Sequence, residues 1–222
     1  MIEDLLPAPI VTNEVFQDPV DPPALFPEEE ALIAESVDAR RREFGTVRAC
    51  ARTALQRIGI PPAPILPGLG GAPQWPDAIV GSMTHCSGYR AAAVAHAADL
   101  VTIGLDAEPN QPLPNDGVEE SVTLAEERGR LRALAAYRPE VCWDRLLFSA
   151  KESVYKAWFP LTGRWLDFDE ASISIDPVGG GFTARLLVPG PVVNGTRLSG
   201  FSGNWLVRNG LIVTAIAVPA KG

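Results

Sequence analysis

The chain has 222 residues, of which 46% are hydrophobic and 21% are charged, an ordinary composition for a globular protein of one large domain or two small ones. Its formal net charge of −8 argues against a nucleic-acid partner, because neutralising a phosphate backbone requires a basic surface. The three cysteines are too few and too scattered for a disulfide framework, so we expect a reducing, cytoplasmic setting.

The sequence also predicts no membrane partner. The N-terminus carries Glu3 and Asp4 instead of a basic segment followed by an apolar one, so it does not look like a secretory signal. The longest uncharged stretch, residues 58–76, contains six prolines and four glycines, which would leave backbone groups unpaired in lipid. We interpret this stretch as a loop.

Charge is unevenly distributed over the first quarter of the chain. Residues 3–38 hold ten acidic side chains and no basic one, whereas residues 40–57 hold six arginines and one acid. We expect the proline-rich acidic part to be an irregular strap with one short strand and a helix-compatible run from Glu28. Apolar residues within 40–58 recur at the helical period, which predicts a helix and a local anion site on it.

Two arginines of this helix are candidate anion ligands. Arg48 lies within the apolar sector and should point inward, and Arg52 lies at its margin. A buried guanidinium needs an anionic or hydrogen-bonding partner, and its planar fork suits phosphate. The alternative is that Arg48 runs along the apolar face to reach water.

Strand-like and helical segments then alternate. Three runs of small or β-branched residues, which could form one small sheet, lie at residues 78–83, 91–96 and 101–106. After a break at 109–117 helical composition returns, and its clearest segment runs from Trp143 to Phe159, closed by Pro160. Further strand patterns lie at residues 173–175, 182–188, 204–207 and 211–218.

The order of helix followed by strands therefore occurs twice, although no residue-level repeat accompanies it. We expect an α+β fold in which residues 1–109 and 110–222 form two halves. A cleft between such halves is a common place for a ligand.

Two acids stand at the end of the third predicted strand, in Gly104-Leu105-Asp106-Ala107-Glu108. Alternation places Asp106 and Glu108 on one face, roughly 7 Å apart along the chain. Such a pair suits magnesium, which prefers carboxylates together with phosphate and water oxygens. A solvent-facing Asp-x-Glu is the commoner interpretation in general, and the metal hypothesis needs a third ligand.

The helix predicted at 143–159 contains Lys151-Glu152-Ser153-Val154-Tyr155-Lys156. Glu152 and Lys156 lie opposite its apolar stripe at an i,i+4 spacing, for which an exposed ion pair is the default interpretation. Phe148 and Tyr155 flank the same polar side, and a face that mixes aromatics with charge is typical of a cleft wall. Two of the three lysines in the chain lie here.

A third polar cluster, Ser82-Met83-Thr84-His85, follows a predicted strand. Its hydroxyls and imidazole would suit phosphate or ribose, although a lone histidine is more often structural. A serine-hydrolase site is not supported, because neither Ser82 nor Ser87 stands in a Gly-x-Ser-x-Gly elbow.

Taken in order, these segments resemble the phosphopantetheinyl transferases of the surfactin-synthetase and enterobactin types, from about Arg40 to Pro160. The ordered set is Gly71-Ala72-Pro73-Gln74-Trp75, Ser82-Met83-Thr84-His85, Gly104-Leu105-Asp106-Ala107-Glu108 and Lys151-Glu152-Ser153-Val154-Tyr155-Lys156. The arginine-rich helix also looks like that of the actinobacterial carrier-priming enzymes.

The resemblance implies a fold of two pseudo-twofold-related α+β halves with coenzyme A as substrate in the cleft. The implied reaction moves 4′-phosphopantetheine onto a serine of an apo acyl or peptidyl carrier protein and releases adenosine 3′,5′-bisphosphate. Asp106, Glu108 and Glu152 would hold Mg²⁺, with Mn²⁺ as an alternative. Glu152, or a water it orients, would accept the serine proton, while Lys151 and Lys156 would neutralise phosphate charge. One chain would complete this site, so a monomer is expected.

The same resemblance implies further contacts. Those expected for coenzyme A are Arg40, Arg48, Arg52, Ser82, Thr84, His85, Asp106, Lys151 and Lys156, with His85 directed to the 3′-phosphate. We expect the carrier to meet residues 118–134 through Leu124, Arg128 and Leu131, helped by the neighbouring Arg130 and Arg132, because carriers of this type are usually acidic.

The sequence departs from the family at one place and leaves other functions open. Relatives often carry a lysine ahead of the Gly-x-Pro-x-Trp segment, whereas residues 66–70 have none, which removes an expected phosphate contact.

A magnesium-dependent phosphodiesterase or nucleotidase would use the same carboxylates with water as the nucleophile. A non-catalytic coenzyme A or carrier-binding module would keep the cleft without turnover. Fatty-acid, polyketide and peptide carriers fit the sequence equally well.

Overall fold

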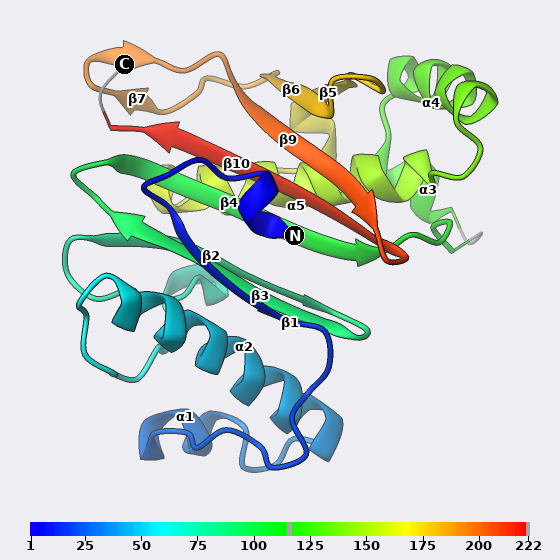
Figure 1. Ribbon diagram of the computed structural model, residues 1–222. Helices are drawn as coiled ribbons and strands as arrows, with labels where there is room; N and C mark the ends of the chain where they lie inside the picture. The colour runs from blue at the N-terminus through cyan, green and yellow to red at the C-terminus, as the bar shows by residue number, and fades with distance from the viewer. Residues whose placement is uncertain (115–116, 221–222) are drawn as a thin grey trace.

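Two antiparallel sheets form the framework of the computed structural model, which describes residues 1–114 and 117–220 (Figure 1). The first sheet has the order β1 (Val11–Val15), β3 (Tyr89–His96) and β2 (Ile79–Cys86). The second has the order β4 (Leu100–Pro109), β10 (Leu211–Pro219), β9 (Gly200–Arg208), β6 (Gly181–Leu186) and β5 (Ala171–Ile175). A short ribbon pairs β7 (Val192–Val193) with β8 (Thr196–Arg197).

Each sheet is covered by one long helix. Helix α2 (Asp38–Arg57) packs on β1 and β3, and α5 (Trp143–Thr162) packs on β4 and β10 (Figure 1). The shorter helices are α1 (Pro27–Leu32), α3 (Val118–Val122) and α4 (Ala125–Tyr137), with 3₁₀ turns η1 (Ile2–Asp4), η2 (Leu69–Gly71) and η3 (Phe168–Glu170). Within the described residues, no helix combines the length and apolarity needed to cross a bilayer.

The α+β class expected from the sequence is confirmed, but the expected sheet at residues 78–106 is wrong in one strand. β2 and β3 pair with each other, whereas β4 pairs with β10 along almost its whole length. The partner of β4 thus comes from the end of the chain, so the order of the strand-like runs along the sequence did not reveal it. The predicted division between residues 109 and 110 therefore cuts through the second sheet, whose first strand comes from the N-terminal half.

Helix α5 continues past the residue predicted to close it. Pro160 lies inside the helix, which ends at Thr162 because Gly163 adopts a left-handed conformation with φ of 61°. The Gly163 N–H donates to the Phe159 carbonyl at 2.8 Å and caps the last turn. The predicted apolar stripe is confirmed, since all of its members are buried in the larger hydrophobic core: Trp143, Leu146, Leu147, Ala150, Val154, Ala157 and Trp158.

Strand β4 approaches α5 so closely that only glycine fits at one position. A Cβ atom at Gly104 would lie 2.0 Å from the Ser153 carbonyl oxygen and 3.0 Å from the Ala157 nitrogen. On the neighbouring strand β10, Thr214 shares buried hydrogen bonds with the Ser149 and Ser153 hydroxyls. Gly104 on β4 and the serines of α5 therefore allow the helix and the sheet to lie this close together.

Replacing Gly104 with alanine should push α5 away from β4. We expect the free energy of unfolding to fall by about 1–3 kcal/mol, the usual cost of overpacking a core. Urea denaturation followed by circular dichroism measures this effect. The matched control is Gly129→Ala in α4, where nothing lies within 4 Å of the added Cβ. Unchanged stability in Gly104→Ala would contradict the close approach.

Candidate active site between β4 and α5

The alternating side chains of β4 divide between two environments. Ile103, Leu105 and Ala107 are buried in a hydrophobic cluster with the N-terminal segment. The intervening residues meet α5: the Thr102 hydroxyl donates to the Ala157 carbonyl, and Asp106 and Glu108 pair with cationic side chains of the helix. The prediction that Asp106 and Glu108 share one face of a strand is confirmed.

Asp106 is buried and only partly satisfied by protein groups. Its Oδ1 accepts hydrogen bonds from Lys156 Nζ at 2.7 Å and from the Thr84 hydroxyl at 3.4 Å. Lys156 also donates to the Leu105 carbonyl at 3.0 Å. Asp106 Oδ2 is buried without a hydrogen-bond partner among the described residues. A buried carboxylate oxygen of this kind is available to a ligand from outside the chain.

Glu108 is paired with Arg145, a residue that the sequence analysis missed. Arg145 Nη1 donates to Glu108 Oε2 at 2.9 Å, and the same guanidinium donates to the carbonyls of Gln111 and Pro112. The available signal was its position on α5, seven residues before Glu152, because two helical turns return to the same face. Arg145 and Lys156 thus lie on either side of Glu152 along the helix.

Glu152 lies on this face of α5 and interacts electrostatically with Asp106. Burial and the negative charge of Asp106 both raise the pKa of Glu152. The same two causes, in the same order, raise the pKa of Glu108, and Arg145 opposes them. Glu108 and Glu152 thus both lie near the negative charge of Asp106, and a cation would relieve this local excess of negative charge.

The site residues fit a divalent cation in ligand type and in charge, but they are not preassembled around one. Nowhere in residues 1–114 and 117–220 does a group of three or more acidic, histidine or cysteine side chains have an arrangement suited to a metal ion. Instead, the Lys156 ammonium and the Arg145 guanidinium occupy one oxygen each of Asp106 and Glu108. The orphaned Asp106 Oδ2 and the carboxylate of Glu152 remain as hard oxygen ligands of the kind that magnesium prefers.

A cavity of about 150 Å³ opens beside Glu152. Its walls are mainly apolar and aromatic, and its lining residues are Lys151, Glu152, Tyr155, Trp165, Leu166, Asp167, Phe168 and Ala171. The Tyr155 ring packs against Trp165 with centroids 4.8 Å apart, and among the described residues its buried hydroxyl has no partner. The cavity therefore suits a slender, largely apolar group that carries an occasional hydrogen-bonding atom.

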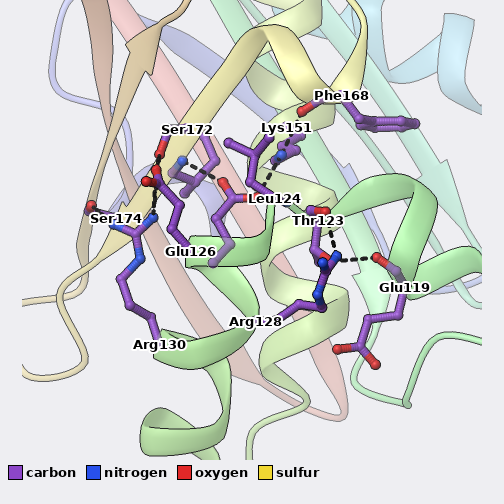
Figure 2. A network of polar contacts seen from close by, with 12 residues as sticks. Glu119, Thr123, Leu124, Glu126, Arg128, Arg130, Lys151, Phe168, Ser172 and Ser174 are labelled. Atoms are coloured by element: carbon purple, nitrogen blue, oxygen red, sulfur yellow. Dashed lines mark hydrogen bonds and ion pairs between the residues drawn. The ribbon is translucent and has the colours of Figure 1, made fainter.

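Lys151 does not lie with Lys156. Its ammonium contacts Glu127 Oε2 at 2.8 Å, and both side chains of this ion pair are almost fully buried. The same ammonium donates to the Phe168 carbonyl at 2.6 Å (Figure 2). The predicted phosphate contact of Lys151 would require this ammonium to leave two close partners.

Arg40 and His85 come together at the edge of the first sheet. Arg40 Nη1 lies 3.3 Å from His85 Nε2, and Glu43 lies within 4 Å of both side chains. Burial is the main cause that lowers the pKa of His85, Glu43 raises it, and the cations Arg40, Lys156 and Arg90 lower it further. Arg40 and His85 are thus brought together at a partly exposed place, and the anion contact expected for them stays a prediction.

Ser82 and Thr84 connect the two sheets. The Ser82 hydroxyl accepts a hydrogen bond from the Leu105 N–H, and the Thr84 hydroxyl accepts one from the Ala107 N–H, each at 3.0 Å. Both side chains are buried. These contacts favour a structural role in holding β2 beside β4 over the coenzyme A contact that was predicted for them.

Arg48 and Arg52 share a buried protein anion that sequence reasoning did not identify. The fully buried Glu29 accepts from Arg52 Nη1 at 2.9 and 3.0 Å and lies 3.7 Å from Arg48 Nε, which itself donates to the Ile65 carbonyl. The anion that a buried guanidinium requires is thus supplied by α1. The contacts favour a structural role for both arginines, and their predicted contact with coenzyme A has no support in this geometry.

The predicted carrier-facing residues lie on or beside α4, but not all of them can reach a partner. Leu131 is 6% exposed and belongs to the core, Leu124 is half-buried, and Arg128 donates back to the Thr123 carbonyl and hydroxyl. Leu131 was predicted as an apolar residue of the segment expected to meet the carrier. An apolar residue of a helix can equally face the protein's own core, and this is where Leu131 lies.

Comparison with known proteins shows the family of the chain. Residues 28–95 match the family described as 4′-phosphopantetheinyl transferase N-terminal domain, and residues 102–196 match the 4′-phosphopantetheinyl transferase superfamily. The chain is 63% identical to the 4′-phosphopantetheinyl transferase Svp of Streptomyces mobaraensis, over 99% of this chain and 90% of that protein. It is 50% identical to Npt of Nocardia iowensis (98% and 99% covered) and 46% identical to PptT of Mycobacterium tuberculosis (98% of each).

The chain therefore belongs to the 4′-phosphopantetheinyl transferase family. The relatives to which it is similar over nearly its full length are actinobacterial enzymes that carry this name. The family and the actinobacterial type that the ordered sequence segments suggested are confirmed.

Proposed function

We propose that the site between β4 and α5 transfers 4′-phosphopantetheine from coenzyme A to a serine hydroxyl of an apo carrier protein, using Asp106, Glu108 and Glu152 to hold Mg²⁺ or Mn²⁺. The observation that carries this proposal is that burial and the negative charge of Asp106 raise the pKa values of Glu108 on β4 and of Glu152 on α5, and that Glu152 also lines an apolar cavity. When bound there, the cation would neutralise the coenzyme A pyrophosphate and make the phosphorus a better electrophile.

The two ends of coenzyme A can be assigned by chemistry. The pantetheine arm is slender, largely apolar and interrupted by amides, which suits the cavity lined by Tyr155, Trp165 and Phe168 and the Tyr155 hydroxyl, which has no partner among the described residues. The 3′-phosphate of the adenosine end suits the Arg40 guanidinium and the neighbouring His85 imidazole, which the phosphate would favour in its protonated form. The pyrophosphate would then lie between these points, near Asp106 and Lys156.

The reaction is a displacement at the phosphorus that bears the pantetheine arm. The serine oxygen forms a bond to this phosphorus, the bond to the bridging oxygen of the pyrophosphate breaks, and adenosine 3′,5′-bisphosphate leaves. Glu152, or a water that it orients, accepts the serine proton, and its raised pKa favours this role. The ammonium of Lys156 lies beside Asp106, where the pyrophosphate would bind, and it would stabilise the negative charge of the leaving group there.

The carrier would approach over α3 and α4, the segment at residues 118–134. Arg130 and Arg132 are exposed there and suit an acidic carrier, Leu124 and Arg128 lie at the start of the segment, and Leu131 is too buried to take part. Because one chain supplies all three acids, a monomer in the cytoplasm would be sufficient for the reaction.

Mass spectrometry of an apo carrier incubated with the enzyme, coenzyme A and Mg²⁺ tests the proposal. We expect the carrier to gain the mass of one phosphopantetheine, and Glu152→Gln to reduce the rate by roughly 10²–10⁴, the usual contribution of a general base. The matched control is Glu35→Gln, which changes an exposed acid distant from Glu152 in the sequence and should leave the rate unchanged.

Two outcomes would contradict the proposal. Hydrolysis of coenzyme A without any change in the carrier would indicate a phosphodiesterase that uses water as the nucleophile. A wild-type rate in Glu152→Gln would remove Glu152 from its assigned role.

Binding of coenzyme A should weaken as the pH rises through neutrality. The pKa of His85 is lowered in the free protein, and a phosphate dianion favours the imidazolium, so it raises this pKa in the complex. Binding therefore takes up a proton between the two pKa values, and affinity is highest below the pKa of the free protein. Isothermal titration calorimetry from about pH 5 to pH 8 measures this dependence.

In the same titration, His85→Gln should lose about tenfold in affinity at low pH and most of the pH dependence. His96→Gln, which changes the exposed second histidine, should retain both. An unchanged pH profile in His85→Gln would rule out the phosphate contact.

A further inference from the structure

Glu127 is a fully buried acid that anchors several elements at one point. Its carboxylate accepts hydrogen bonds from the Leu124 N–H at 2.8 Å and from the Ile173 N–H at 2.7 Å, and it pairs with Lys151 Nζ at 2.8 Å. Figure 2 shows the same ammonium also donating to the Phe168 carbonyl. Four segments, α4, β5, η3 and α5, are therefore joined by two side chains.

The two lysines of α5 face different environments. They are five positions apart, which corresponds to about 140° around the helix. The side chain of Lys156 is 28% exposed and reaches Asp106, whereas that of Lys151 is 2% exposed and ends inside the protein. Burial lowers the pKa of Lys151, and its hydrogen bond to Glu127 opposes this shift, as expected for an ammonium held by an internal anion.

The Glu127–Lys151 pair separates two cavities. Lys151 and Phe168 line the cavity of about 150 Å³ beside Glu152, and Glu127 lines a second cavity of about 230 Å³ between α4 and β5. The pair is almost fully buried in the wall between them. Its hydrogen bonds to the Leu124 and Ile173 N–H groups and to the Phe168 carbonyl connect the segments that form this wall.

We infer that Glu127 and Lys151 are positioning residues, which fix the wall of the cavity beside Glu152 instead of contacting the phosphates of coenzyme A. The inference rests on the proposed function, because that cavity is the one assigned to the pantetheine arm. It reassigns Lys151, which the family resemblance places among the phosphate ligands, and it gives Glu127 a role that the sequence analysis did not foresee.

The physics of buried ion pairs makes the two roles distinguishable. Removing one partner leaves an uncompensated buried charge, which is strongly unfavourable, whereas removing both charges together is much less costly. If the role of Lys151 is to pair with Glu127, removing both charges should restore part of the stability and activity that either single change destroys. If Lys151 instead contacts the substrate, removing Glu127 cannot compensate for the loss of Lys151.

The test is a double-mutant cycle of Glu127→Gln, Lys151→Met and the two combined, in the full-length protein. We measure the urea midpoint, kcat/KM for carrier modification and the affinity for adenosine 3′,5′-bisphosphate. Either single change should lower kcat/KM about tenfold or more, and the double variant should recover most of the loss. Affinity for adenosine 3′,5′-bisphosphate should stay within about twofold in all three, because this ligand lacks the arm that enters the cavity.

The exposed pair of Asp4 and Arg208 provides the matched control. Its cycle of Asp4→Asn and Arg208→Met should leave the urea midpoint and kcat/KM almost unchanged, because exposed ion pairs contribute little. If Lys151→Met does not fold, Glu127→Gln and the double variant supply the same comparison, and folding of the double variant alone would itself support the pair.

Two results would overturn the inference. Loss of affinity for adenosine 3′,5′-bisphosphate in Lys151→Met without recovery in the double variant would make Lys151 a phosphate ligand. A lowered urea midpoint with unchanged kcat/KM in the folded variants would make the pair structural only. Failure of the proposed function would look different, because the wild-type enzyme itself would then neither bind coenzyme A nor modify a carrier.

Discussion

The close approach of β4 to α5 is the constraint on which the rest of the site depends. At Gly104 the strand backbone touches the helix backbone, so no side chain larger than hydrogen is accommodated. From this contact β4 runs along α5, and every second residue of the strand faces the helix. Asp106 and Glu108 follow Gly104 in this alternation and therefore face Glu152 and its cationic neighbours without any special loop to hold them.

Charge is balanced at this site by protein groups that a ligand can replace. Lys156 and Arg145 each occupy one oxygen of a β4 acid, while a further oxygen of Asp106 is buried without a partner among the described residues. A divalent cation would take over the attraction to the acids, which would free the ammonium and the guanidinium for the phosphates of a substrate. On the proposed function, a cation and a polyanion would therefore bind together at this site.

Local patterns in the sequence predicted the parts of the fold that local physics decides. The apolar stripe of α5, the helix containing Arg48 and the shared face of Asp106 and Glu108 all follow from periodicities of 3.6 and 2 residues. The strand partner of β4 could not be predicted in this way, because it depends on β10, more than 100 positions later in the chain. Pairing between distant strands leaves no local signal.

Side-chain partners were the least predictable feature of the site. The sequence indicates that Arg48 and Lys151 need anions, but not which anions they find. Glu29 and Glu127 each lie on a short or weakly amphipathic helix, where an acid is usually exposed, and both are fully buried. Glu29 is buried beside its arginine partners because α1 packs against α2, and Glu127 is buried beside Lys151 because α4 packs against α5.

The central claim is that Asp106, Glu108 and Glu152 bind one divalent cation together. Anomalous diffraction from Mn²⁺ in crystals grown with coenzyme A tests it most directly. The account predicts one strong peak with an oxygen of each acid at about 2.1 Å, and with Lys156 and Arg145 moved from their present partners. A peak elsewhere, or a metal held by substrate phosphates with Glu152 directed away from it, would contradict the account.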